Sequence, residues 1–189
     1  MVRLKRKPGR ACCAGFSLLE MLVALAVLGV LLTVAAPSFR SMWSSVRMSA
    51  VTNDFLAALH LTRSSAIRLN RSVVMCVSGD AQSCNANADW HTGWMVFVDL
   101  NNNGRRDGED EQVLLTQSGV DSGITITGNS AVNRFISWRS DGRMRRGTGR
   151  GVPQMGTVMF CPEYGQGRQI VVNIGGRMRV QTVSGGCGG

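Results

Sequence analysis

The chain has 189 residues, with 21 Lys and Arg against 12 Asp and Glu, which gives a formal net charge of +9. This length is enough for one globular domain with its own core beside an N-terminal segment. The two histidines, His60 and His91, lie far apart and no Cys-x-x-Cys pair occurs, which argues against a zinc site. No Ser/His/Asp order or carboxyl pair in apolar surroundings stands out, so neither catalysis nor a bound cofactor is expected.

The N-terminus combines a basic leader with an apolar run. Residues 1–15 carry five basic side chains and no acid, and residues 16–36 are apolar except for Glu20 and Ser and Thr. At about 1.5 Å per residue the run makes a helix roughly 32 Å long, close to the ~30 Å hydrocarbon core of a bilayer. The basic flank predicts that the leader stays in the cytoplasm and the rest is translocated. A carboxylate inside a membrane costs roughly 2.5–3.5 kcal/mol, so Glu20 is expected to have a use.

Three interpretations of this segment compete. A cleaved signal peptide needs a small-residue cut site after the apolar run, and the candidate at residues 34–36 is followed directly by Pro37, a poor context. An uncleaved signal anchor explains the leader and the run but leaves Glu20 without a role. The third interpretation is a precursor that is cut in front of the apolar run.

At this point the chain resembles type IV prepilins and pseudopilins, through Gly15-Phe16-Ser17-Leu18-Leu19-Glu20 and Pro37. The resemblance implies that a prepilin peptidase cuts after Gly15 and that the new N-terminal residue, Phe16, is methylated. Glu20 would then pair with the free amine of a neighbouring subunit, because an unpaired buried carboxylate is penalised. Pro37 lacks an N–H group, so the helix is expected to bend or loosen there.

The rest of the chain predicts a helix followed by β-structure. Apolar residues recur at helical spacing over residues 37–70, which makes an amphipathic continuation of the first helix. Residues 71–189 alternate with period two between Gly-rich turns and form a β-rich globular domain. The expected strands are Ser72–Val77, Gly93–Val98, Gln112–Thr116, Ile124–Thr127, Arg134–Trp138, Thr157–Cys161, Gln169–Ile174 and Arg177–Val183. The fold class is therefore α+β, a long helix packed on antiparallel sheet.

This order of elements is similar to that of the FimT/GspH branch of minor pilins and pseudopilins. The segment Gly93-Trp-Met-Val-Phe-Val-Asp99 with the polar loop after it, and a late Gly-Arg-x-Arg strand at residues 176–179, carry the likeness. The resemblance implies assembly with other pilins in a filament, and an inner-membrane protein with a periplasmic domain before assembly.

Four cysteines remain after removal of the leader, an even number in a translocated domain. An oxidising periplasm favours two disulfides. Cys76–Cys84 would close a short loop, and Cys161–Cys187 would hold the C-terminus.

The polar loop after residue 98 has the oxygen pattern of a calcium loop, with Gly104 at the sharp turn. The candidate ligands are Asp99, Asn101, Asn103, Asp107 and Asp110. A strand precedes the loop where an EF-hand has a helix, and Arg105 and Arg106 add positive charge. The alternative is a polar turn in which Asn and Gly adopt left-handed backbone. We therefore expect no bound metal, and calcium is the one metal ion whose binding to this loop remains to be tested.

The last third of the chain is basic: from Arg134 onward there are nine Arg against Asp141 and Glu163. Two segments there share a Gly-Arg-Met-Arg pattern, and the resemblance links the second to DNA binding in members that act in natural transformation. The candidate DNA-binding residues are Gly176, Arg177 and Arg179, extended to Arg143, Arg145, Arg146 and Arg150. Residues two apart on a strand share a face about 6.6 Å apart, which suits adjacent phosphates. The alternative is a solvated strand with Arg on its outer face.

Base stacking has three aromatic candidates near these arginines: Phe135, which is more plausible as a core residue, Trp138 and Tyr164. Non-specific phosphate binding is therefore favoured over base readout. Two functions follow: a minor pilin that primes or joins the pilus and binds DNA for uptake, or a pseudopilin at the tip of a type II secretion pseudopilus that does not touch DNA.

Overall fold

A computed structural model describes residues 16–120 and 123–183, without the side chains of 34–38 and 40. The chain divides into two compact units, Met1–Arg40 and Ser41–Gly189. One helix, α1 (Leu18–Leu69), contributes to both and is continuous through Pro37, so the expected bend there stays a prediction.

The described part of the first unit is the N-terminal part of α1, whose apolar side chains are solvent-exposed; Leu22, for example, is 56 % exposed. Within the described ranges, no helix combines the length and apolarity that a membrane crossing requires. The span predicted for residues 16–36 therefore stays a prediction.

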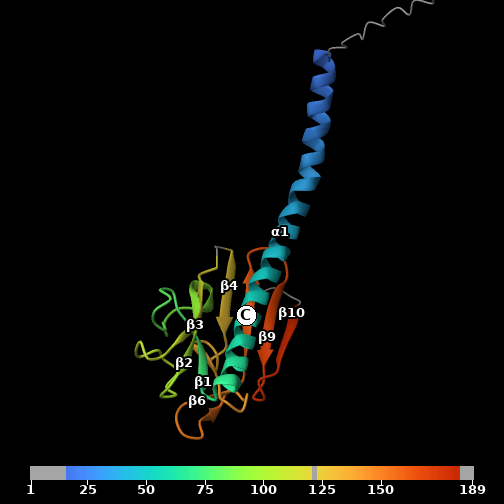
Figure 1. Cartoon of the computed structure of the whole chain (residues 1–189). Helices are drawn as coiled ribbons and strands as arrows, with labels where there is room; N and C mark the ends of the chain where they lie inside the picture. The colour runs from blue at the N-terminus through green and yellow to red at the C-terminus, as the bar shows by residue number, and fades with distance from the viewer. Residues whose placement is uncertain (1–15, 121–122, 184–189) are drawn as a thin grey trace, which may run out of the picture. The chain divides into compact units, whose positions relative to one another are not determined.

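The second unit packs the C-terminal half of α1 on two antiparallel sheets (Figure 1). The first sheet has the order β3-β2-β1-β5 and the second the order β10-β9-β8-β4, with a small pair β6-β7. The strands of the first sheet are β1 (Ser72–Val77), β2 (Gly93–Asp99), β3 (Val113–Ser118) and β5 (Phe135–Trp138). Those of the second are β4 (Ile124–Gly128), β8 (Gly156–Pro162), β9 (Gly167–Val172) and β10 (Met178–Val183). The small pair is β6 (Arg145–Arg146) with β7 (Val152–Pro153), and a short 3-10 helix, η1 (Trp90–Thr92), precedes β2.

The main core lies between α1 and the two sheets. Phe55 on α1 is fully buried and meets Trp90, Trp94 and Phe160 edge-on, with ring centroids 5.1 to 5.3 Å apart. Edge-to-face contacts of this kind add to the free energy of area burial. Since Trp94 is on β2 and Phe160 is on β8, this one side chain joins both sheets to the helix.

A smaller cluster covers the other face of the first sheet, around Cys76, Met95 and Phe97. Phe135 packs against it, and the loop after β2 approaches so closely that a Cβ on Gly104 would lie 2.7 Å from the Phe135 ring. Both faces of this sheet are therefore covered, which explains why every residue of β1 and β2 is buried.

The α+β fold class and the eight expected strands are confirmed, with ends that differ by up to two residues. Sequence patterning missed η1 and the β6-β7 pair, which are too short for a periodic signal. Leu69 is one of the apolar residues at helical spacing that were expected to face the core, but it is the last residue of α1 and is 39 % exposed.

Candidate functional site

The described part of the predicted assembly segment begins at Phe16, since Gly15 lies outside the described residues. The Ser17 hydroxyl accepts the Glu20 backbone N–H at 3.2 Å, as an N-cap residue does at the start of a helix. Phe16 is 79 % exposed and Glu20 is also exposed, so both side chains are accessible to another subunit.

The two Gly-Arg segments form two similar turns. In the turn between β9 and β10, Gly176 has φ +73° and its N–H donates to the Asn173 carbonyl at 2.8 Å. In the turn after β5, Gly142 has φ +72° and its N–H donates to the Arg139 carbonyl at 2.8 Å. A side-chain oxygen then receives the N–H of the following arginine in both turns, Asn173 Oδ1 at 3.0 Å and Asp141 Oδ1 at 2.9 Å. These Asx contacts fix the backbone from which each arginine projects.

The two turns pack directly against each other. A Cβ on Gly176 would lie 2.6 Å from the Gly142 carbonyl oxygen and 2.7 Å from Trp138 Nε1, so only glycine fits there. The Met144 N–H donates to the Ile174 carbonyl at 3.0 Å and ties the two segments together. Arg63 of α1 donates from Nη1 to the Gly176 carbonyl at 2.8 Å. The structure thus brings two sequence-distant Gly-Arg copies into one surface, the paired turns, built from residues 139–144 and 173–177.

The predicted DNA-binding arginines are not equivalent in this surface. Arg143, Arg177 and Arg179 are exposed, and Arg177 lies just before β10, the edge strand of its sheet, with Arg179 two residues further on the same face. Arg145 is half-buried and donates from Nη1 to the carbonyl oxygens of Arg150 and Gly151, at 3.0 and 3.4 Å. Its position is therefore internal to the β6-β7 hairpin.

Arg146 and Arg150 are exposed in the same hairpin. Arg63 and Arg139 were not among the site residues predicted from the sequence. The Arg139 side chain donates to the Gly147 carbonyl at 2.6 Å. Both hold turn backbone in place, and no local pattern marked them.

Two of the three aromatic candidates for base stacking are excluded by burial or position. Trp138 is fully buried, so its prediction as a stacking residue is wrong, and its Nε1 has no hydrogen-bond partner among the described residues. Tyr164 is 64 % exposed but lies in the β8–β9 turn, at the opposite end of β9 from the paired turns. Phe135 is half-buried against the core, as expected. The paired turns therefore offer charge and not stacking.

The candidate calcium loop is organised by hydrogen bonds between its own groups. Asp99 is buried and accepts the N–H groups of Asn103 and Gly104, at 3.2 and 2.9 Å. Burial raises the pKa of Asp99, although these hydrogen bonds oppose the rise. The side-chain amides of Asn101 and Asn103 donate to Asp107 and lower its pKa.

Glu111, which sequence analysis did not single out, closes the same loop. Its buried carboxylate accepts the N–H groups of Leu100 and Asp107, at 3.0 and 2.9 Å. Within the part of the chain that the structure describes, no three His, Cys, Asp or Glu side chains gather in a way that could hold a metal ion. Calcium binding, with Asp110 as the last ligand, stays a hypothesis that a calorimetric titration tests.

The disulfide Cys76–Cys84 is confirmed, with an S–S distance of 2.06 Å. It joins β1 to the loop before η1. Cys161 on β8 is also disulfide-bonded, but its predicted partner Cys187 lies outside the described residues, so that pairing stays a prediction.

Residues 51–176 match the family described as Type II transport protein GspH, about two thirds of the chain. The chain belongs to the GspH family. Residues 10–36 also match the prokaryotic N-terminal methylation motif, which covers the cleavage segment deduced from the sequence. The two matches together place this GspH-family protein among the minor pilins and pseudopilins, a class whose members assemble with other pilins in a filament.

Among solved structures, the type IV minor pilin FimU of Pseudomonas aeruginosa is similar, with a TM-score of 0.51 and 20 % identity over 70 % of this chain and 91 % of that chain. That likeness shows a shared fold. The minor pseudopilin EpsH of the Vibrio cholerae Type 2 Secretion System matches with a TM-score of 0.47 and 11 % identity, over 71 % of this chain and 96 % of that one. No curated protein matches this chain.

Proposed function

We propose that this GspH-family protein is a minor type IV pilin that binds DNA through its paired turns and serves DNA uptake in natural transformation. The observation that carries the proposal is the contact between the two Gly-Arg turns, which brings the exposed Arg143 and Arg177 onto one surface, with the exposed Arg179 two residues further along on β10. The backbone there is fixed by Asx hydrogen bonds and by Arg63, so the arginines start from an ordered frame.

The chemistry of the paired turns suits phosphate contacts without sequence preference. Arginine binds phosphate oxygens through two parallel N–H donors. Most of the free energy of such binding comes from releasing counterions, so affinity falls steeply as salt rises. Because Trp138 is buried and Tyr164 lies elsewhere, base stacking is not part of the proposal.

The filament role proceeds through the N-terminal segment. In the proposal a prepilin peptidase removes residues 1–15 after Gly15, Phe16 is methylated, and residues 16–36 hold the protein in the inner membrane until assembly. Glu20 then pairs with the Phe16 amine of a neighbouring pilin. The match to the N-terminal methylation motif supports this course.

The test is DNA affinity of the full chain in uncharged detergent, measured by fluorescence anisotropy over a range of salt. If about four phosphates are neutralised, the slope of log K against log salt on duplex DNA is about −3.6. Arg177→Ala with Arg179→Ala removes two contacts, and the slope falls to about −1.8. Arg105→Ala, an exposed arginine in the loop after β2, is the matched control and leaves the slope unchanged. An unchanged slope in the double variant rejects the proposal.

The second candidate function is a minor pseudopilin of a type II secretion system, favoured by the description of the matched family. In that case the wild-type chain shows no salt-dependent DNA binding and co-assembles with secretion pseudopilins. The simplest test is the identity of the neighbouring genes: pilus genes favour the first function and type II secretion genes favour the second.

A further inference from the structure

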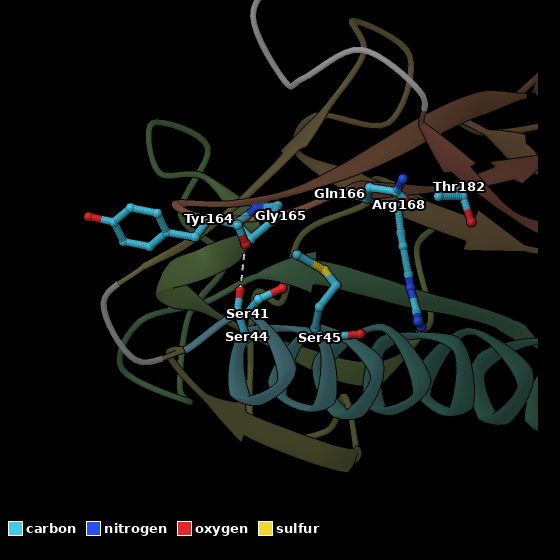
Figure 2. Close-up of a pocket in the computed structure, with 10 residues that line it drawn as sticks. Ser41, Ser44, Ser45, Tyr164, Gly165, Gln166, Arg168 and Thr182 are labelled. Atoms are coloured by element: carbon cyan, nitrogen blue, oxygen red, sulfur yellow. Dashed lines mark hydrogen bonds between the residues drawn. The ribbon is translucent and has the colours of Figure 1, made fainter. Parts of the chain in front are cut away.

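A polar pocket of about 340 Å³ opens between α1 and the β8–β9 turn (Figure 2). It lies at the opposite end of β9 from the paired turns, so it is separate from the proposed DNA site. Its polar lining comprises Ser41, Ser44 and Ser45 on α1, Gln166 in the turn, Arg168 on β9 and Thr182 on β10. None of the lining residues is acidic.

Arg168 occupies an unusual place for a charged side chain. It precedes Ile170 and Val172 on the face of β9 that is turned to α1, and both of those residues are in the core. Figure 2 shows Arg168 extending from its strand toward the helix, beside Thr182. Within the described ranges, its guanidinium has no hydrogen-bond partner. A half-buried arginine that faces a pocket without a partner is suited to an anion from outside the chain.

The serines supply further donors on the opposite wall. Ser41 and Ser45 are four residues apart and therefore share one face of α1, and their hydroxyl groups have no hydrogen-bond partner within the described part of the chain. Ser44 donates to the Tyr164 carbonyl at 2.7 Å and fixes the β8–β9 turn as the rim of the pocket. A guanidinium facing free hydroxyl groups suits a ligand with several charged oxygens, which is the chemistry of a phosphate group.

We propose that this pocket binds the phosphate group of an anionic phospholipid. The inference rests on the predicted membrane anchor, because Ser41 follows the end of that segment, Ala36, by five residues. Five residues span at most about 18 Å, so Ser41 lies no further than that from the end of the predicted anchor. Trp43 and Tyr164, which are 57 % and 64 % exposed, are aromatic residues of the two types that are enriched at membrane surfaces.

An anionic lipid is favoured over a zwitterionic one by charge. The ammonium group of phosphatidylcholine would bring a second positive charge close to Arg168, whereas phosphatidylglycerol adds only hydroxyl groups. The pocket would thereby hold the globular domain at the membrane surface before the subunit leaves for the filament.

The test uses the full chain in uncharged detergent and counts bound lipid by native mass spectrometry. Phosphatidylglycerol and phosphatidylcholine with the same acyl chains are compared, and inorganic phosphate is added as a competitor. We expect phosphatidylglycerol to bind at about tenfold lower concentration than phosphatidylcholine. Arg168→Gln should lower that affinity about tenfold, as loss of a charge-assisted contact does, while Arg105→Gln should leave it unchanged.

Ser45→Asp is the second variant, because Ser45 is exposed on the helix and its replacement does not disturb the core. Its new carboxylate should repel the phosphate and abolish the preference for phosphatidylglycerol. Equal binding of the two lipids, or unchanged binding by both variants, overturns the proposal. Displacement of the lipid by an equal concentration of inorganic phosphate overturns the lipid assignment in favour of a free phosphate site. The assay contains no DNA, so its outcome does not depend on the proposed DNA binding. It is carried out in detergent micelles, so it also does not require residues 16–36 to cross a bilayer.

Discussion

Gly176 shows how a single residue determines whether the two Gly-Arg turns can meet. Its left-handed φ is costly for other residues, and the Gly142 carbonyl and the Trp138 indole leave no space for a side chain. The glycine of Gly-Arg-x-Arg therefore acts by close packing as well as by flexibility. This contact was not predictable from sequence, because nothing local indicates that residues 142 and 176 touch.

We expect Gly176→Ala to lower the free energy of unfolding by about 2–5 kcal/mol, the sum of the left-handed backbone penalty and overpacking against a carbonyl. Gly175→Ala is the matched control: its nearest new contact would be Asn173 Oδ1 at 3.4 Å, an ordinary separation, so the change should be within about 1 kcal/mol. Urea denaturation of the full chain in detergent measures both. Equal loss in the two variants would contradict the packing argument.

Asp80 provides a pH-dependent contribution to stability. Hydrogen bonds from the Ser83 hydroxyl at 2.7 Å, and from the Ser83 and Gln82 N–H groups at 2.9 Å each, hold the pKa of Asp80 well below its ordinary value of 3.8. A depressed carboxyl pKa means that the stabilisation is present above the unfolded value and is lost as pH falls. Asp80→Asn should therefore be less stable than wild type at pH 7, with a difference that narrows below pH 3.8.

The measurement is the urea midpoint of both proteins between pH 7 and pH 2. Glu109→Gln, at an exposed position in the loop after β2, serves as the control for removing one carboxylate. A difference between Asp80→Asn and wild type that stays constant over the whole pH range would reject the role of Asp80.

At the scale of elements, α1 is the part on which both sheets assemble, and this arrangement was largely predictable. The apolar spacing of its second half and the unbroken run without Gly or Pro indicate an amphipathic helix. β1 was predicted with its observed bounds because a run with three valines, which favour strands, is set between polar segments. β6 was missed because Arg-Arg in a Gly-rich stretch carries no period-two signal, and it pairs only through tertiary contacts.

Phe55 tests whether one helix position holds the two sheets together. Phe55→Ala should lower the free energy of unfolding by about 3–5 kcal/mol, because it leaves a cavity among Trp90, Trp94 and Phe160. Phe55→Leu, which keeps most of the volume, should lower it by less than about 1.5 kcal/mol. Val46→Ala, on an exposed side chain of the same helix, should change it by about 0.5 kcal/mol or less.

Thermal or urea unfolding followed by tryptophan fluorescence reports this directly, since two of the three contacting rings are indoles. Equal stability of the Ala and Leu variants would show that the cavity refills and that the edge-on contacts contribute little.

At the scale of the whole molecule, the three candidate functional sites lie in different parts of the chain. The exposed arginines of the paired turns lie at one end of β9 and β10, the partnerless Arg168 lies at the other, and the predicted assembly segment is in a separate unit. The cleavage and assembly segment was recognisable from sequence because its pattern is local and ordered. The paired turns and the pocket were not, because each needs residues that are far apart in the chain.

Because the predicted assembly residues and the proposed DNA-binding residues lie in different parts of the chain, a mutation can impair assembly without changing DNA binding. Glu20→Gln removes the carboxylate that is expected to pair with the Phe16 amine of a neighbour, and an unpaired buried ammonium is strongly unfavourable. We expect at least a tenfold loss of the subunit from sheared filaments, with unchanged membrane insertion and unchanged DNA affinity of the purified chain. Ser17→Ala is the control, because Ser17 caps the Glu20 N–H and its loss affects only the helix start, by about 1 kcal/mol. If Ser17→Ala reduces incorporation as much as Glu20→Gln does, Glu20 acts through the local helix terminus and not through a neighbouring subunit.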